Sequence, residues 1–153
     1  MSLSRIEDTA AFMEKYRLLI DAGETLALPV LGNSMSPFII HKRDTVYLRK
    51  PAFPLKRGDI ALYRRGNGDF IMHRVCKVEN GLYTTVGDAH MVLEPGISDE
   101  QIIAVAVSAI RKGREQRPGI FWWDFFAGFW LSILPARHFI MKTYGFFSKV
   151  IRR

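Results

Sequence analysis

The sequence predicts a mainly β protein with helices at both ends. Between residues 24 and 110, short β-favouring runs alternate with turn residues. On either side of that region, apolar residues recur at helical spacing instead. We therefore expect three parts: an N-terminal amphipathic helix (1–23), a compact antiparallel β domain coiled into a partial barrel (24–110), and a basic, aromatic tail that forms a pair of helices (111–153).

The N-terminal helix is predicted over residues 4–22. Met13, Tyr16 and Ile20 belong to an apolar stripe with helical spacing, and Gly23 follows as a stop signal. The first twenty residues also carry several charges and contain no uninterrupted apolar run, so they do not resemble an export signal. We therefore expect the domain on the cytoplasmic face of a membrane, with the extracytoplasmic face as the alternative.

Six strands are predicted in the middle of the chain. Two glycine-containing segments, 65–69 and 80–81, have the composition of hairpin turns. Such spacing is typical of small antiparallel sheets and barrels. The predicted strands are 26–31, 45–49, 59–64, 70–78, 82–86 and 102–110.

The tail carries the whole excess of positive charge. The chain has a net charge of +7, and residues 111–153 contain nine basic and two acidic residues. All three tryptophans lie there too, in a pattern of basic and aromatic residues that favours a membrane interface. The alternative is a helical hairpin folded over the sheet. Nucleic acid is disfavoured because the basic residues accompany bulky apolar ones. The expected membrane-contacting residues are Trp122, Trp123, Trp130, Phe139, Tyr144 and Phe147.

Three short segments carry residues suited to nucleophilic catalysis. Ser34 follows an apolar run, with glycine before it and proline after it, and this favours an exposed turn beside free backbone N–H groups. His73 lies within a predicted strand, where its position as a base would be fixed. Asp88 follows a third run and is the candidate acceptor of the other imidazole N–H. Gly32, Asn33 and Ser34 itself form the expected oxyanion turn.

Four short motifs follow one another along the chain: Ser34-Met35-x-Pro37, Arg57-Gly58-Asp59-Ile60, His73-Arg74-Val75 and Gly87-Asp88-Ala89. In this order they resemble the type I signal peptidases, closest to the archaeal and endoplasmic-reticulum branch, which uses histidine. The resemblance covers about residues 26–110. It implies a signal-peptidase-like β domain that cleaves signal or leader peptides after small residues, with Ser34 as nucleophile, His73 as base and Asp88 in support. It also implies a second acid, for which Glu94 is the nearest match.

The sequence departs from that family in three places. Gly32 replaces the usual hydroxyl residue two positions before the nucleophile, so a side-chain oxyanion donor is missing unless Asn33 substitutes. His90 stands where the family tends to have asparagine. The hydrophobic element is at the C-terminus rather than the N-terminus.

Two other functions remain open from the sequence. One is a non-catalytic, peptidase-like module that binds peptides at a membrane. The other is a self-processing regulatory peptidase, although residues 1–23 are too short for a DNA-binding domain. The four histidines have no ligand spacing with the cysteine or with acids, so we expect no metal and no cofactor.

Overall fold

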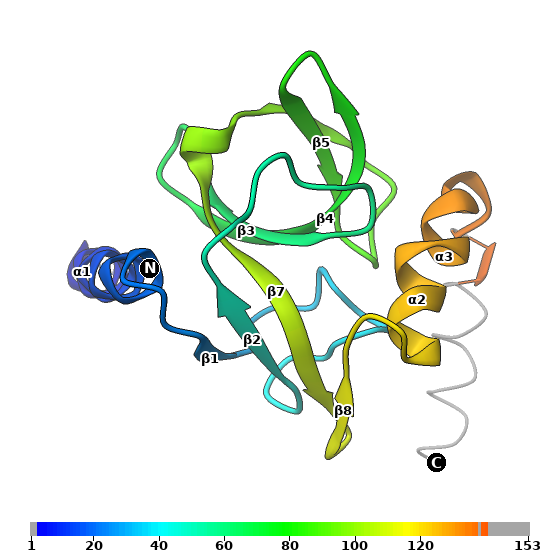
Figure 1. Ribbon diagram of the computed structural model, residues 1–153, viewed down its shortest axis with the longest axis horizontal. Coiled ribbons are helices and arrows are strands. Elements are labelled where there is room, and N and C mark those ends of the chain that lie inside the picture. Colours follow the sequence, from blue (N-terminus) through cyan, green and yellow to red (C-terminus); the bar gives the residue numbers. More distant parts are fainter. Residues whose placement is uncertain (1–2, 138, 141–153) are drawn as a thin grey trace.

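The computed structural model describes residues 3–137, 139 and 140. An eight-stranded antiparallel sheet forms its centre, in the order β1-β2-β7-β3-β4-β5-β6, with β8 paired to β7. Helix α1 lies at the left of the sheet in Figure 1, and α2 and α3 lie at the right. The strands are β1 (Leu26–Pro29), β2 (Thr45–Arg49), β3 (Ile60–Arg64), β4 (Phe70–Glu79), β5 (Leu82–Val86), β6 (Glu94–Ile97), β7 (Ile102–Arg111) and β8 (Arg114–Gln116).

The predicted mainly antiparallel β fold is confirmed, as are all six predicted strands to within two residues at each end. Strands β6 and β8 were not predicted. Within the segment 111–117, the chain turns back at a hairpin and Arg114–Gln116 pairs with β7. The sheet is open, since β1 and β6 stand at the two ends of the strand order.

Strand β3 lies between two hydrophobic cores. Ile60 and Leu62 face one core, whereas Ala61 and Tyr63 face the other. All four are buried, so the strand is continuously apolar instead of alternating. Because paired residues of antiparallel strands share a face, the same division continues into β4, where His73 pairs with Ala61 and the next residue lies on the opposite face.

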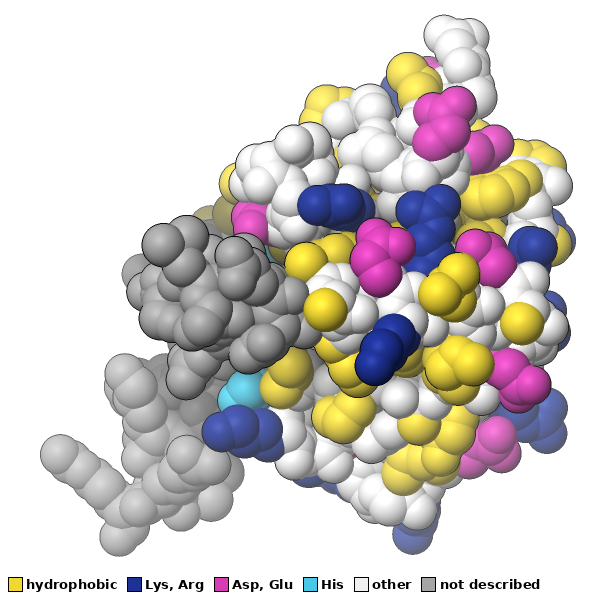
Figure 2. Space-filling view, turned by 90° about the vertical axis from the view of Figure 1, so that its left-hand side faces the viewer, with side chains coloured by type: hydrophobic (Ala, Val, Ile, Leu, Met, Phe, Trp, Pro, Cys, Tyr) yellow, Lys and Arg dark blue, Asp and Glu magenta, His cyan; other side chains and the backbone are white. Residues whose placement is uncertain are grey.

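Helix α1 (Leu3–Asp21) confirms the predicted N-terminal helix. Met13, Tyr16 and Ile20 are buried at spacings of three and four residues, which places them on one face of the helix. The Tyr16 hydroxyl donates to the carbonyl of Leu26, so the helix is tied to the start of β1. On the side of the molecule that carries α1, the coloured hydrophobic side chains are interspersed with charged ones of both signs (Figure 2).

The tail helices pack against the domain. Gly128 separates α2 (Phe121–Ala127) from α3 (Phe129–Ser132), and the 3₁₀ turn η2 (Leu134–Ala136) follows. Trp123 and Trp130 belong to the same core as α1 and β7. In the part of the chain that the structure describes, no helix combines the length and apolar character needed to cross a membrane.

The membrane-contacting prediction is therefore wrong for Trp123 and Trp130, each 5% exposed. The edge-to-face contact between Trp123 and Phe38 shows why, because an apolar ring filling the domain core gains the same burial that a membrane would give it. Trp122 and Phe139 are exposed, as that prediction requires. Tyr144 and Phe147 lie outside the described residues.

Candidate active site

Ser34 lies in a tight turn directly after β1. Gly32 has a φ of +83°, a left-handed conformation that glycine adopts without the steric penalty of a side chain. The Gly32 N–H donates to Nδ1 of His41 at 2.9 Å, and the N–H of Ser36 donates to the carbonyl of Asn33 at 3.1 Å. Met35 is buried and anchors the turn. The predicted turn is confirmed, and its conformation accounts for glycine at a position where the family has a hydroxyl residue.

His73 is fixed in the middle of β4, as predicted, and is only 6% exposed. Its ring packs edge-to-face between Tyr63 and His90, with centroid distances of 6.4 and 5.7 Å. Because His73 pairs with Ala61 of β3 and the next residue, Arg74, pairs with Val86 of β5, the backbone of His73 has little freedom to move. The imidazole therefore has a well-defined position.

Gly87 is the point at which the Ser34 turn and His73 meet. A Cβ atom at Gly87 would lie 2.5 Å from the Ser34 carbonyl oxygen and 3.1 Å from Nε2 of His73. Only a residue without a side chain therefore fits at position 87, between the Ser34 turn and the His73 ring. The N–H of Ala89 donates to the Ser34 carbonyl at 2.9 Å and so holds the two loops together.

The His73 ring is oriented with Nε2 toward the Ser34 turn. Among the described residues, no hydrogen bond joins the Ser34 hydroxyl to this ring. Hydrogen bonds between a nucleophile and its base are often long in free enzymes and shorten when substrate binds. The arrangement thus brings the two predicted residues close together, with Nε2 of His73 beside the turn that contains Ser34.

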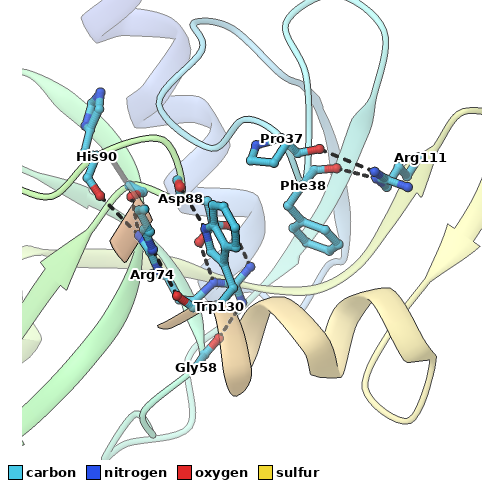
Figure 3. Close-up of polar contacts among 10 residues, drawn as sticks. Pro37, Phe38, Gly58, Arg74, Asp88, His90, Arg111 and Trp130 are labelled. Atoms are coloured by element: carbon cyan, nitrogen blue, oxygen red, sulfur yellow. Dashed lines mark hydrogen bonds and ion pairs between the residues drawn. The ribbon is translucent and has the colours of Figure 1, made fainter. Parts of the chain in front are cut away.

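Asp88 does not contact His73, and this corrects the role predicted for it. Its two carboxylate oxygens accept hydrogen bonds from Nε and Nη2 of Arg74 at 2.9 and 2.8 Å. Both side chains are completely buried, and Arg74 also donates to the carbonyl of Gly58 (Figure 3). Arg74 follows His73 in the strand and projects from the opposite face of the sheet. Asp88 lies on that face and satisfies a buried guanidinium instead of the imidazole.

Glu94 is the carboxylate that faces the outer nitrogen of His73. Its Oε2 lies 3.9 Å from Nδ1, and Nδ1 is buried without a hydrogen-bond partner. Arg65 forms a two-pronged ion pair with Glu94, and this pair holds the pKa of the carboxyl below its ordinary value. Glu94, predicted as the second acid, is therefore the carboxylate beside Nδ1 of His73, whereas Asp88 binds Arg74.

The pKa of His73 is lowered from 6.5 to about 4. Burial is the main cause, and His90 and Arg65 add to it, whereas Glu94 opposes it. The ring is consequently neutral near pH 7. A neutral imidazole can accept a proton, as a general base must.

We expect NMR titration of the His73 ring to give an apparent pKa near 4. His90→Ala should raise this value, because His90 lowers it through charge repulsion. Since the folded pKa lies below the unfolded one, the associated stability is complete above pH 6.5. It should then decrease by about 3 kcal/mol as the pH falls to 4. A folded-state pKa at or above 6.5 would contradict the burial of the ring.

A cavity of about 230 Å³ opens beside Ser34. Its walls come from the Ser34 turn and from the start of β4, and most of the lining side chains are apolar. The small volume favours a small apolar side chain next to the reacting bond. The lining residues are Val30, Leu31, Gly32, Asn33, Ser34, Met35, Phe70, Ile71 and Met72.

Backbone N–H groups of the turn are available for an oxyanion. Within the described part of the chain, the N–H groups of Ser34 and Met35 donate to no acceptor. Asn33 is exposed and is one of the residues that line the cavity. The turn can therefore offer backbone donors to a developing negative charge without the hydroxyl residue that Gly32 replaces.

Two residues of this region were missed at the sequence level. Trp130 donates its indole N–H to the Asp88 carbonyl at 2.9 Å, and Arg137 donates to the carbonyls of Gly87 and His90. A signal for Arg137 was present, since it is the only basic residue between 118 and 141. No group of three or more His, Cys, Asp and Glu side chains in the described residues is arranged to hold a metal ion.

Comparison with known proteins gives no family for this chain. A scan against models of protein families and a search of curated proteins each found no match. The similarity to signal peptidases thus rests on four short motifs. Function is inferred below from the residues and their geometry.

Proposed function

We propose that the protein is a membrane-associated serine endopeptidase of the signal peptidase type, which cleaves signal or leader peptides. Ser34 is the nucleophile, His73 the base and Glu94 the acid that orients it. The observation that carries this proposal is the orientation of the buried His73 ring, whose Nε2 faces the Ser34 turn while Nδ1 faces Glu94. The open sheet would then be a variant of the signal peptidase β domain.

The reaction follows from this geometry. His73 Nε2 takes the hydroxyl proton as Ser34 Oγ attacks the scissile carbonyl, and the oxyanion is stabilised by the N–H groups of the turn. The imidazolium then gives its proton to the leaving amine, and water hydrolyses the acyl-enzyme in a second cycle. The ionised Glu94 stabilises the imidazolium, which the buried site would otherwise strongly disfavour.

The surroundings of Ser34 favour an apolar peptide with a small residue at the cleavage point. The cavity beside Ser34 is small and largely apolar. Leu31, which lines this cavity, is 74% exposed. Exposed apolar side chains at a site are typical of surfaces that bind hydrophobic segments.

The test is digestion of a mixed peptide library by the purified protein, followed by mass spectrometry of the new N-termini. We expect cleavage after small residues by the wild-type protein and none by Ser34→Ala. Ser36→Ala, a serine in the same turn, is the matched control and should cleave normally. Specific peptide binding without any cleavage would instead favour the non-catalytic module.

Membrane association would use the exposed side of the tail, at the cytoplasmic face. Phe121 and Phe129 are 69% and 58% exposed, and Phe125 stacks between them. Trp122 is also exposed and lies under the Arg111 guanidinium at 5.2 Å. Adjacent aromatic and basic groups suit the interface of an anionic membrane.

We expect the double variant Phe121→Ser/Phe129→Ser to bind anionic lipid vesicles about tenfold more weakly or worse, because two exposed rings lose their burial in lipid. Co-sedimentation with vesicles containing phosphatidylserine measures this. Phe12→Ser, which removes a ring of 55% exposure from α1, is the control and should bind normally. Equal binding by both variants would contradict a membrane role for the tail.

A further inference from the structure

The loop 87–90 is held by the tail through its backbone. Nη1 of Arg137 donates to the carbonyls of Gly87 and His90, both at 3.2 Å. Nε1 of Trp130 donates to the carbonyl of Asp88 at 2.9 Å, a contact visible in Figure 3. Three of the four carbonyl groups of this loop therefore accept hydrogen bonds from residues that lie about 40 to 50 positions later in the chain.

The same loop touches both proposed catalytic residues. Gly87 separates the Ser34 carbonyl from His73 Nε2 without room for a methyl group, and Ala89 donates to the Ser34 carbonyl. A displacement of the loop would therefore change the distance between nucleophile and base. Such displacements of about 1 Å can lower a rate by about a hundredfold.

Arg137 is unusual for a residue that only fills space. It is 1% exposed, and no carboxylate lies within ion-pair distance of it in the described structure. Burial lowers the pKa of its guanidinium, and its Nη2 is buried without a partner. An apolar side chain would avoid these costs. What an apolar side chain could not do is bind two loop carbonyls while packing on the Trp130 ring, 5.3 Å away.

We infer that Trp130 and Arg137 are positioning residues for the peptidase site. They hold loop 87–90 in place, and the loop in turn fixes the position of Ser34 relative to His73. The peptidase part of this inference rests on the proposed function. The tail segment that ends at Arg137 is thus a component of the active site as well as the carrier of the exposed aromatic residues.

The Arg74–Asp88 pair holds the loop from its other side. Arg74 binds the Asp88 carboxylate, whereas Trp130 binds the carbonyl of the same residue. Asp88 is consequently fixed by groups from β4 and from α3 together. Loss of either tail contact should loosen the loop without removing the ion pair, so that the fold survives and the site does not.

The test uses the full chain with Trp130→Phe, Arg137→Lys and Arg137→Met. Ser132→Ala is the matched control, since Ser132 contacts Arg57 and not the loop. We expect Trp130→Phe and Arg137→Met to lower kcat about 10- to 100-fold with little change in KM. Arg137→Lys should recover part of this loss, because lysine keeps the positive charge and an N–H donor group. Ser132→Ala should behave as the wild-type protein does.

The second readout is the NMR titration of His73, which does not require cleavage. Tyr63, Arg65, His90 and Glu94 face this ring and are retained in all variants. A loosened loop admits water and moves His90 away, and both changes raise the pKa of His73 above its value near 4. If the wild-type protein cleaves no peptide, the proposed function is overturned. The His73 titration would still test whether Trp130 and Arg137 hold loop 87–90.

The inference about Trp130 and Arg137 would be overturned if the pKa of His73 were unchanged in folded Trp130→Phe and Arg137→Met. It would also be overturned if the wild-type protein were active and these variants had an unchanged kcat. Trp130→Phe keeps an aromatic ring at this buried position and removes the N–H donor together with the second ring of the indole, so it still tests the contact if Arg137→Met does not fold. A raised His73 pKa in Ser132→Ala as well would also contradict the inference, because the effect would then be a general loosening of the tail.

Discussion

Replacing Ser34 by alanine should lower kcat/KM for peptide cleavage by about 10⁴-fold or more, because no other group can form the acyl-enzyme. His73→Ala should lower it by a similar factor. The His73 ring is the proposed base, and its Nε2 lies beside Gly87 and the Ser34 turn. Steady-state kinetics on a cleaved library peptide would measure both losses.

The double variant Ser34→Ala/His73→Ala should be no slower than either single variant. Residues that act as one unit lose their whole contribution when either is removed. Ser36→Ala should keep nearly full activity. Additive losses in the double variant would show that Ser34 and His73 act separately, contrary to the proposed mechanism.

Asp88→Asn should reduce the free energy of unfolding by about 3–5 kcal/mol, because it leaves the buried Arg74 charge without its partner. Both side chains are 0% exposed, so solvent cannot compensate. Urea denaturation followed by fluorescence would measure the change. The effect is expected on stability, since the Asp88 carboxylate contacts Arg74 and not the imidazole.

The double variant Arg74→Met/Asp88→Leu provides the control for this interpretation. Removing both charges together should be less destabilising than Asp88→Asn alone, because no unpaired charge remains. If Asp88→Asn instead left stability unchanged and abolished cleavage, Asp88 would support His73 directly, and the assignment to Glu94 would be wrong.

Local patterns were sufficient to predict most of the sheet. The runs at 45–49 and 82–86 match β2 and β5 at both ends, and Asn80 and Gly81 have the positive φ angles of the predicted hairpin turn. Strand β6, Glu94–Ile97, was missed because it contains proline and glycine. It forms because β5 offers a free edge, which a local pattern does not encode.

The tail and the acid of the site could not be predicted in the same way. An apolar, aromatic segment has the same composition whether it packs on lipid or on a protein core, and only the fold shows that Trp123 meets Phe38. Ser34 and His73 were located by motif order. The choice between Asp88 and Glu94 depended on which face of β4 each acid meets, and that follows from the pairing of His73 with Ala61.

The most direct measurement compares new peptide N-termini in cells that carry the wild-type protein, Ser34→Ala, His73→Ala or Ser36→Ala. The proposed function predicts one set of cleavage products that is present with wild type and Ser36→Ala and absent from both other lines. Identical N-termini in all four lines, with each protein folded and present, would contradict a Ser34–His73 peptidase.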